Sequence, residues 1–338
     1  MVLSRLPTKR AMANRKAGRH CRWPDGRQAW GEERVSGLTS VTVQPGFAFS
    51  VDDPIMTIGS CFAREIEVVL AARGFDLPAL AVTVPDGQRP DGTKPNVILN
   101  KYSVHSMENE IRWAFEGPPC EPERFFLSVG DDLWHDPHVV HNVTPGPMSV
   151  VQSRRDGIAA MMRELPRCRV VVITLGLVES WFDKETRLYL NTIPPVTVLK
   201  QQSRRFELHV LDYGDVLKAL DRIHALIAAY GHPEFHILCT VSPVPFKMTY
   251  TGQDAIVANT YGKSVQRAAA EVFAAKHENV DYFPSYEIVA TSDRQRAYLQ
   301  DNIHVTPEAV DAIMSTVLDT YCVSGQDAAS KDSSVEPG

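Results

Sequence analysis

Apolar runs of strand length alternate with helical patterns along most of this chain. Residues 54–58 form a short apolar run that ends at Gly59 and Ser60. A helical pattern begins at once and places apolar side chains on one face: Phe62, Ile66, Val69 and Leu70. The pattern therefore predicts a strand, a turn at Gly59-Ser60 and a helix, which Gly74 can end.

Four further runs have the length of strands: residues 79–84, 169–176, 235–241 and 280–283. Residues 170–173 are all β-branched, which is typical of a parallel strand buried on both faces. Helical patterns occur at about 104–115, 215–230 and 254–277, and from Thr306 onward. Strands separated by helices predict an α/β/α domain with a parallel sheet of about five strands.

Folds of this class carry their active sites at the carboxyl ends of the strands. Ser60, Gly176 and Ser242 each follow or end a predicted strand. We therefore expect these three positions on one edge of the sheet.

The chain divides into three predicted parts. Residues 1–45 form a basic arm that is not followed by an apolar signal core, and we expect this arm to be flexible. Residues 46–323 form one folded domain, in which residues 85–165 are interpreted as an insertion near the active edge. Residues 324–338 are rich in Ser, Asp, Ala and Gly and predict a disordered tail.

Composition narrows the class of protein. The 338 residues are 44% apolar and 22% charged, which is ordinary for a globular chain. The net charge of −6 argues against a nucleic-acid binder, and no apolar run is long enough for a membrane span. Six scattered cysteines without a CxxC pair indicate a reducing compartment, and we expect a cytoplasmic protein. Nothing resembles a nucleotide-binding glycine loop, so we expect no cofactor.

Three side chains have the chemistry of a nucleophilic site. Ser60 lies where a strand ends and a helix begins, and a serine hydroxyl needs an adjacent base to become nucleophilic. His304 can be that base, and Asp301, three residues earlier, can hold the imidazole in the required tautomer. The start of the helix after Ser60 offers positive potential to a developing oxyanion.

Two alternatives arise from neighbouring residues. Cys61 could be the nucleophile in place of Ser60, because thiolates form readily at helix N-termini, although we favour a structural role for it. His135, His138 and His141 have a spacing that zinc could use. Pro137 interrupts any helix there, so we interpret these histidines as loop residues bordering the cleft and expect no metal site.

Several motifs in order resemble those of one protein family. Residues 59–63 read Gly-Ser-Cys-Phe-Ala, the signature that names the GSCFA family. Further matching stretches follow: Thr174-Leu-Gly-Leu177 with Glu179 and Trp181, Val241-Ser-Pro-Val-Pro245, Tyr282-Phe-Pro-Ser-Tyr-Glu-Ile288 and Asp301-x-x-His304-Val305. The resemblance covers about residues 50–320. The family is similar to the SGNH/GDSL hydrolases, which implies a flavodoxin-like three-layer fold, a nucleophilic Ser60 and a role for Asp301 and His304 as its partners.

One departure concerns the oxyanion hole. Typical SGNH enzymes carry a GxND motif whose Asn donates to the oxyanion, whereas here the stretch is Gly176-Leu-Val-Glu179, with Val178 in place of Asn. Backbone N–H groups of Ser60 or Cys61 and Gly176, or the side chain of Asn100, are the remaining candidates. Glu179 and Trp181 follow a strand end and can face the pocket, whereas Lys263 lies in a helical pattern and is interpreted as a surface residue.

The sequence thus predicts an SGNH-like serine esterase or acyltransferase that acts on an ester, plausibly an O-acyl carbohydrate. The expected partner is that small-molecule or carbohydrate ester, and the sequence gives no oligomeric state. A non-catalytic carbohydrate-binding or scaffold protein on the same fold is the alternative. A metal hydrolase built on the three histidines is a weaker third possibility.

Overall fold

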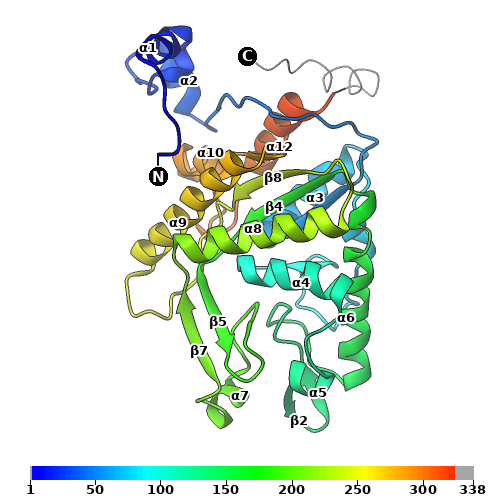
Figure 1. Ribbon diagram of the computed structural model, residues 1–338. Coiled ribbons are helices and arrows are strands. Elements are labelled where there is room, and N and C mark those ends of the chain that lie inside the picture. Colours follow the sequence, from blue (N-terminus) through cyan, green and yellow to red (C-terminus); the bar gives the residue numbers. More distant parts are fainter. Residues whose placement is uncertain (1, 324–338) are drawn as a thin grey trace.

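A computed structural model describes residues 2–323 of the chain. Its central sheet has four parallel strands in the order β1-β4-β8-β9, with bounds Ile55–Gly59, Val170–Leu175, His236–Val241 and Val280–Tyr282. Two small antiparallel sheets lie outside it: β2 (Leu127–Gly130) with β3 (Leu133–His135), and β6 (Leu188–Tyr189) with β5 (Glu179–Asp183) and β7 (Phe206–Val210). Figure 1 shows β5 and β7 projecting away from the central sheet.

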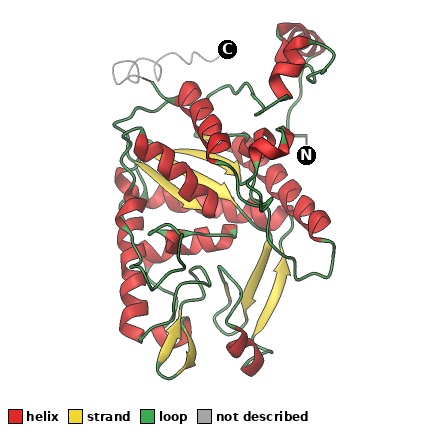
Figure 2. Ribbon diagram, turned by 180° about the vertical axis from the view of Figure 1, so that it is seen from behind, coloured by secondary structure: helices red, strands yellow, loops and turns green. Residues whose placement is uncertain are grey.

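Helices cover both faces of the central sheet, which confirms the predicted α/β class with flanking helices (Figures 1 and 2). One face packs against α3 (Cys61–Ala72), α10 (Ser285–Thr291), α11 (Arg294–Ala297) and α12 (Pro307–Tyr321). The other packs against α4 (Val104–Glu116), α6 (Met148–Met162), α8 (Tyr213–Tyr230) and α9 (Ala255–Lys276). The described residues also contain two short helices, α5 (Pro122–Phe125) and α7 (Val196–Gln201). They contain four 3-10 turns: η1 (Arg19–Cys21), η2 (Pro78–Ala81), η3 (Val97–Leu99) and η4 (Leu165–Arg167).

Strand alternation explains the two cores. Val170 and Val172 point to the α3 face, whereas Val171, Ile173 and Leu175 point to the α8 face. All six residues of β4 are buried, as the run of β-branched residues predicts for a central parallel strand.

The expectation of about five strands is wrong by one, because residues 79–84 do not form a strand. The 3-10 turn η2, which begins at Pro78, takes up residues 79–81 of the expected strand instead. The N–H of Ile55 donates to the carbonyl of Asp76, at 2.9 Å, and the N–H of Val84 donates to the carbonyl of Pro95, at 2.8 Å. The apolar side chains of Ala79 and Val84 are nevertheless buried, so the run fills the core beside β1 without pairing as a strand.

The N-terminal segment contains α1 (Thr8–Ala17) and α2 (Ala29–Val35), and α1 buries no side chain. Both helices stand apart from the sheet in Figure 1. The chain joins the domain from Gly37 on, where the carbonyl of Gly37 accepts the N–H of Asp293 at 2.8 Å. Phe47 and Phe49 are core residues. The tail predicted over 324–338 lies outside the described residues.

Gly59 is fixed by the close approach of β1 and β4. A Cβ atom at this position would lie 1.9 Å from Thr174 Oγ1 and 2.7 Å from the Thr174 carbonyl oxygen. The second of these is backbone and cannot turn aside, so only glycine fits at the end of β1.

We expect Gly59→Ala to destabilise the protein by at least about 1–3 kcal/mol through overpacking. Gly157→Ala is the matched control, because Gly157 lies inside α6 with no atom within 4 Å of an added Cβ. That change should stabilise the protein by about 0.5–1 kcal/mol through helix propensity. Urea unfolding of both variants measures the difference, and equal stabilities would contradict the close approach.

Candidate active site

Ser60 lies at the carboxyl edge of the sheet, between β1 and α3. It is the N-cap residue of α3, yet its side chain makes no capping hydrogen bond. The residue is buried and its Oγ has no hydrogen-bond partner among the described residues. A buried hydroxyl without a hydrogen-bond partner costs stability, so the contacts within the described residues do not account for a serine at this position.

A crossing segment, residues 100–103, passes over the carboxyl end of β1, from the outer side of Gly59 to Leu177 beyond the end of β4. The N–H of Lys101 donates to the carbonyl of Gly59, and the N–H of Leu177 donates to the carbonyl of Tyr102, both at 2.7 Å. Gly176 lies against this segment, since an added Cβ would be 2.7 Å from the Tyr102 carbonyl oxygen and 3.4 Å from Ser60 Cβ. The fold thus places Gly176 in contact distance of Ser60.

Asn100 belongs to the same segment and is buried beside Gly59, with which it forms an isolated parallel bridge. Its carbonyl accepts a hydrogen bond from Asn191 Nδ2, at 2.8 Å, while Asn191 Oδ1 accepts the N–H of Tyr102, also at 2.8 Å. Burial raises the pKa of Tyr102 to about 12, and a hydrogen bond with the Asn100 side chain opposes that shift. The Oδ1 atom of Asn100 is buried without a partner within residues 2–323.

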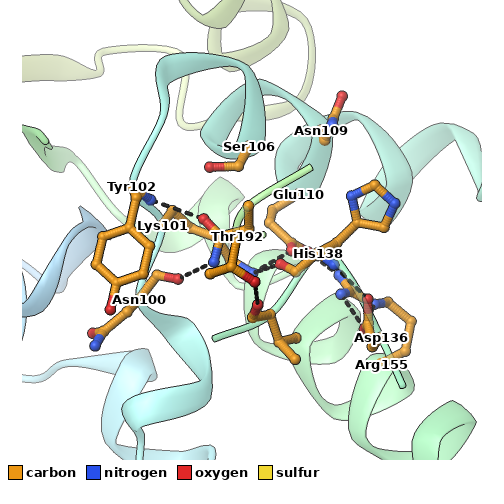
Figure 3. A network of polar contacts seen from close by, with 12 residues as sticks. Asn100, Lys101, Tyr102, Ser106, Asn109, Glu110, Asp136, His138, Arg155 and Thr192 are labelled. Atoms are coloured by element: carbon orange, nitrogen blue, oxygen red, sulfur yellow. Dashed lines mark hydrogen bonds and ion pairs between the residues drawn. The ribbon is translucent and has the colours of Figure 1, made fainter. Parts of the chain in front are cut away.

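A buried network of charged side chains anchors the crossing segment through Lys101 (Figure 3). Lys101 Nζ lies 2.5 Å from Glu110 Oε1 and donates to the carbonyl of His138 at 2.7 Å. Arg155 joins Glu110, at 2.5 Å, to Asp136, at 3.0 Å from Nε. Burial disfavours ionisation of Glu110 and Asp136, but the charges of Arg155 and Lys101 and the hydrogen bonds from Arg155 together outweigh it and lower both carboxyl pKa values.

Asp301 and His304 form a preformed pair in the loop before α12. Asp301 Oδ2 lies 2.5 Å from His304 Nδ1, and Asp301 Oδ1 accepts the N–H groups of Ile303 and His304 at 2.9 and 3.0 Å. The hydrogen bond from His304 and those two N–H groups hold the pKa of Asp301 well below its usual range. With Nδ1–H donated to the carboxylate, His304 presents Nε2 as an acceptor.

The loop of this pair is tied to the same edge of the sheet as Ser60. Tyr298 Oη donates to the carbonyl of Pro243, which follows the carboxyl end of β8, at 3.2 Å. Val305 packs in the core cluster that contains Phe62 of α3. His304 itself is 47% exposed and makes no hydrogen bond to Ser60.

Glu179 is engaged by the loop between β8 and α9. Its carboxylate accepts the N–H of Tyr250, at 3.0 Å, and the hydroxyl of Thr249. Val178, at the position where SGNH enzymes carry Asn, is buried in the core against α9. Backbone N–H groups and the Asn100 side chain therefore stay the candidates for an oxyanion hole.

Lys263 is the residue that sequence reasoning misplaced. It is 2% exposed on α9 and donates from Nζ to the carbonyl of Gly176 at 3.0 Å, so its interpretation as a surface residue is wrong. The residues one turn away on the same face, Asn259 and Gln266, also have polar side chains. This row of polar side chains along one helical face is the sequence signal that could have indicated a polar site around Lys263.

Cys61 follows Ser60 and is half-buried. Burial raises the pKa of its thiol, the charge of Glu65 adds to the shift, and the charge of Lys263 opposes it. A raised pKa disfavours the thiolate that a cysteine nucleophile needs.

The three histidines do not form a metal-binding cluster in the described part of the chain. His135 and His138 are buried and His141 is exposed, and burial lowers the pKa of His138 to about 4. No group of three or more His, Cys, Asp or Glu side chains within residues 2–323 is arranged to hold a metal ion. His135 instead lines a small cavity with Trp134 and Arg154. A larger cavity, of about 780 Å³, lies between η2 and α6 and includes none of the candidate site residues in its lining.

Comparison with known protein families gives a match over most of the chain. The GSCFA family model matches residues 54–316, which run from the start of β1 into α12 and include Ser60 and His304. No curated protein matches the chain. Within residues 2–323, no helix is both long enough and apolar enough to cross a membrane.

We expect Arg155→Met to cost about 3–5 kcal/mol, because it leaves the buried Asp136 without a cation and Glu110 with Lys101 alone. The folded-state pKa values of both carboxyls are lowered, so the network stabilises the wild type above about pH 4, and this contribution is lost as the pH falls further. Thermal unfolding between pH 3 and 8 measures both effects. The control is Arg167→Met, since Arg167 pairs with Asp76 and Glu164 at the surface and should change little. Equal melting temperatures for the two variants would contradict the buried network.

Proposed function

The chain belongs to the GSCFA family, and on that premise we propose that it is an SGNH-like serine esterase or acyltransferase. The observation that carries the proposal is the unpartnered, buried hydroxyl of Ser60 at the start of α3, beside Asn100 and Gly176. The Asp301–His304 pair supports it, because an imidazole held by a carboxylate is what a serine nucleophile requires.

In the proposed reaction, Ser60 Oγ attacks the acyl carbonyl carbon while His304 Nε2 takes the hydroxyl proton. The negative charge on the carbonyl oxygen is stabilised by backbone N–H groups at the start of α3 and by the amide of Asn100. The C–O bond then breaks, and the imidazolium returns its proton to the leaving alkoxide. Water or a second hydroxyl group releases the acyl group from Ser60 by the same steps, with His304 again as the base.

Proton transfer requires His304 to come within about 2.6–3.2 Å of Ser60, and unliganded sites are often looser than this. The Asp301–His304 pair lies in an exposed loop, whereas Ser60 is enclosed. Substrate binding would therefore have to bring the loop and Ser60 together.

The substrate class is proposed from the aromatic residues at this edge. Trp181 of β5 and Tyr250 lie edge to face with ring centres 5.6 Å apart, and Tyr250 is exposed. Aromatic rings with one free face are suited to contact the apolar face of a sugar. They support an O-acyl carbohydrate as the ester.

A non-catalytic carbohydrate-binding protein on the same fold is the second candidate. It is favoured by the lack of a hydrogen bond between Ser60 and His304. Such a protein would bind a sugar but would not react with a serine-directed probe.

A fluorophosphonate probe tests the assignment. We expect it to label wild-type protein at Ser60, with a rate reduced by about 10³-fold or more in His304→Ala and no labelling in Ser60→Ala. In ester hydrolysis, the double variant should be no worse than either single variant, because the two residues act as a unit. Peptide mass spectrometry locates the adduct. No labelling of folded wild-type protein would favour the binding protein instead.

Cys61 provides an independent test of which neighbour is the nucleophile. Cys61→Ser should retain most of the labelling and hydrolysis, whereas Cys61→Leu should impair both by overpacking the turn. Circular dichroism confirms that each variant is folded. The Ser60 assignment fails if Cys61→Ser is folded but inactive while Ser60→Ala keeps its activity.

A further inference from the structure

Lys263 is a buried amine without a carboxylate partner among the described residues. Its one hydrogen bond within this part of the chain goes to the Gly176 carbonyl, at 3.0 Å. Of the titratable groups on the elements around it, the Cys61 thiol is the one whose charge bears on it. A buried ammonium group that is not paired with an anion costs several kcal/mol of solvation, so a purely structural role gives it little reason to be retained.

The hydrogen bond ties α9 to the immediate surroundings of Ser60. The peptide between Gly176 and Leu177 is held at both ends, by Lys263 at its carbonyl and by the Tyr102 carbonyl at its N–H. Gly176 in turn lies within contact distance of Ser60. Lys263 therefore fixes a peptide whose Gly176 lies beside Ser60.

The charge of Lys263 also reaches the start of α3. It lowers the pKa of the Cys61 thiol, which is adjacent to Ser60, and a charge on Cys61 raises the pKa of Lys263 in return. No acidic side chain of the described residues neutralises Lys263, so in this dry setting its field acts on nearby groups at full strength.

We propose that Lys263 is a positioning residue of the Ser60 site, which fixes the Gly176 peptide and supplies the positive charge that stabilises the oxyanion. The role of Lys263 toward an oxyanion rests on the proposed function, because an oxyanion forms only in that reaction. The position of its charge beside Gly176 is independent of the proposed function. Val178 stands where SGNH enzymes carry an Asn donor, and a nearby ammonium group compensates for that loss electrostatically.

The ionisation of Lys263 makes the proposal testable. Burial lowers its pKa to about 7, against an ordinary value of about 10.4, so the folded protein binds fewer protons than the unfolded chain between these pH values. Stability attributable to Lys263 therefore rises with pH across this range. Below about pH 7 the penalty of the buried charge is present in full.

The first measurement needs no enzymatic activity. Thermal unfolding of wild type, Lys263→Met and Lys276→Met is compared from pH 6 to pH 10. Lys276, in the last turn of α9, pairs with Asp221 at the surface and is the matched control. Near pH 7 we expect Lys263→Met to have a higher melting temperature than the wild type. By pH 10 this difference should shrink by at least about 5 °C. A difference that does not change with pH would overturn the buried charge.

The second measurement is the pH dependence of fluorophosphonate labelling. Wild type and Lys276→Met should lose rate above about pH 7 as Lys263 loses its proton, whereas Lys263→Met should be at least tenfold slower at pH 7 and lack this alkaline limb. The electrostatic role would be overturned if Lys263→Met lost labelling rate above pH 7 as the wild type does. It would also be overturned if the wild-type rate rose through pH 7 and that of Lys263→Met did not. Equal labelling of Ser60→Ala would instead overturn the proposed function and leave the melting experiment as the test of Lys263.

Discussion

The candidate site depends on one extended segment that crosses the carboxyl end of an outer strand. β1 and β4 are paired as far as Gly59 and Thr174, and residues 100–103 run from the outer side of Gly59 across the end of β1 to Leu177. This geometry brings together three parts of the chain that are far apart in sequence. It also explains why both strand ends carry glycine, because a side chain on Gly59 or Gly176 would collide with backbone oxygens.

The buried charges around Lys101 serve this segment. Lys101 could not be buried alone. Glu110 compensates its charge, and Glu110 and Asp136 together compensate that of Arg155. Replacing such a network by apolar residues can leave the stability of a protein unchanged or raise it, so stability alone does not account for it. A network with fixed donor and acceptor directions does, however, define one position for Asn100 and Tyr102, which apolar packing would define less sharply.

Much of the fold could be predicted from local patterns, because β-branched runs and helical periodicity report burial directly. The strands at 169–176 and 235–241 and the helices over 104–115, 215–230 and 254–277 were of this kind. The strand expected at 79–84 was wrong, because residues 78–81 form the 3-10 turn η2 and a short apolar run has the same pattern in a buried turn as in a buried strand. In the site, motifs singled out Ser60, Asp301 and His304, whereas Lys263 was missed because a lysine in a helix usually reaches solvent. Its burial depends on where α9 meets the end of β4, which no local window contains.

The turn η2 beside β1 has a consequence for how this chain meets other copies of itself. A parallel sheet has two outer strands, and an outer strand with free backbone groups can recruit a strand from another molecule. Here the outer edge of β1 is occupied at both ends, by the Asp76 carbonyl at Ile55 and by the N–H of Lys101 at Gly59. Only residues 56–58 lie between these bonds, which is too short a stretch for a foreign strand to find a register. The segments before η2 and around Lys101 therefore protect this edge of the sheet against edge-to-edge aggregation.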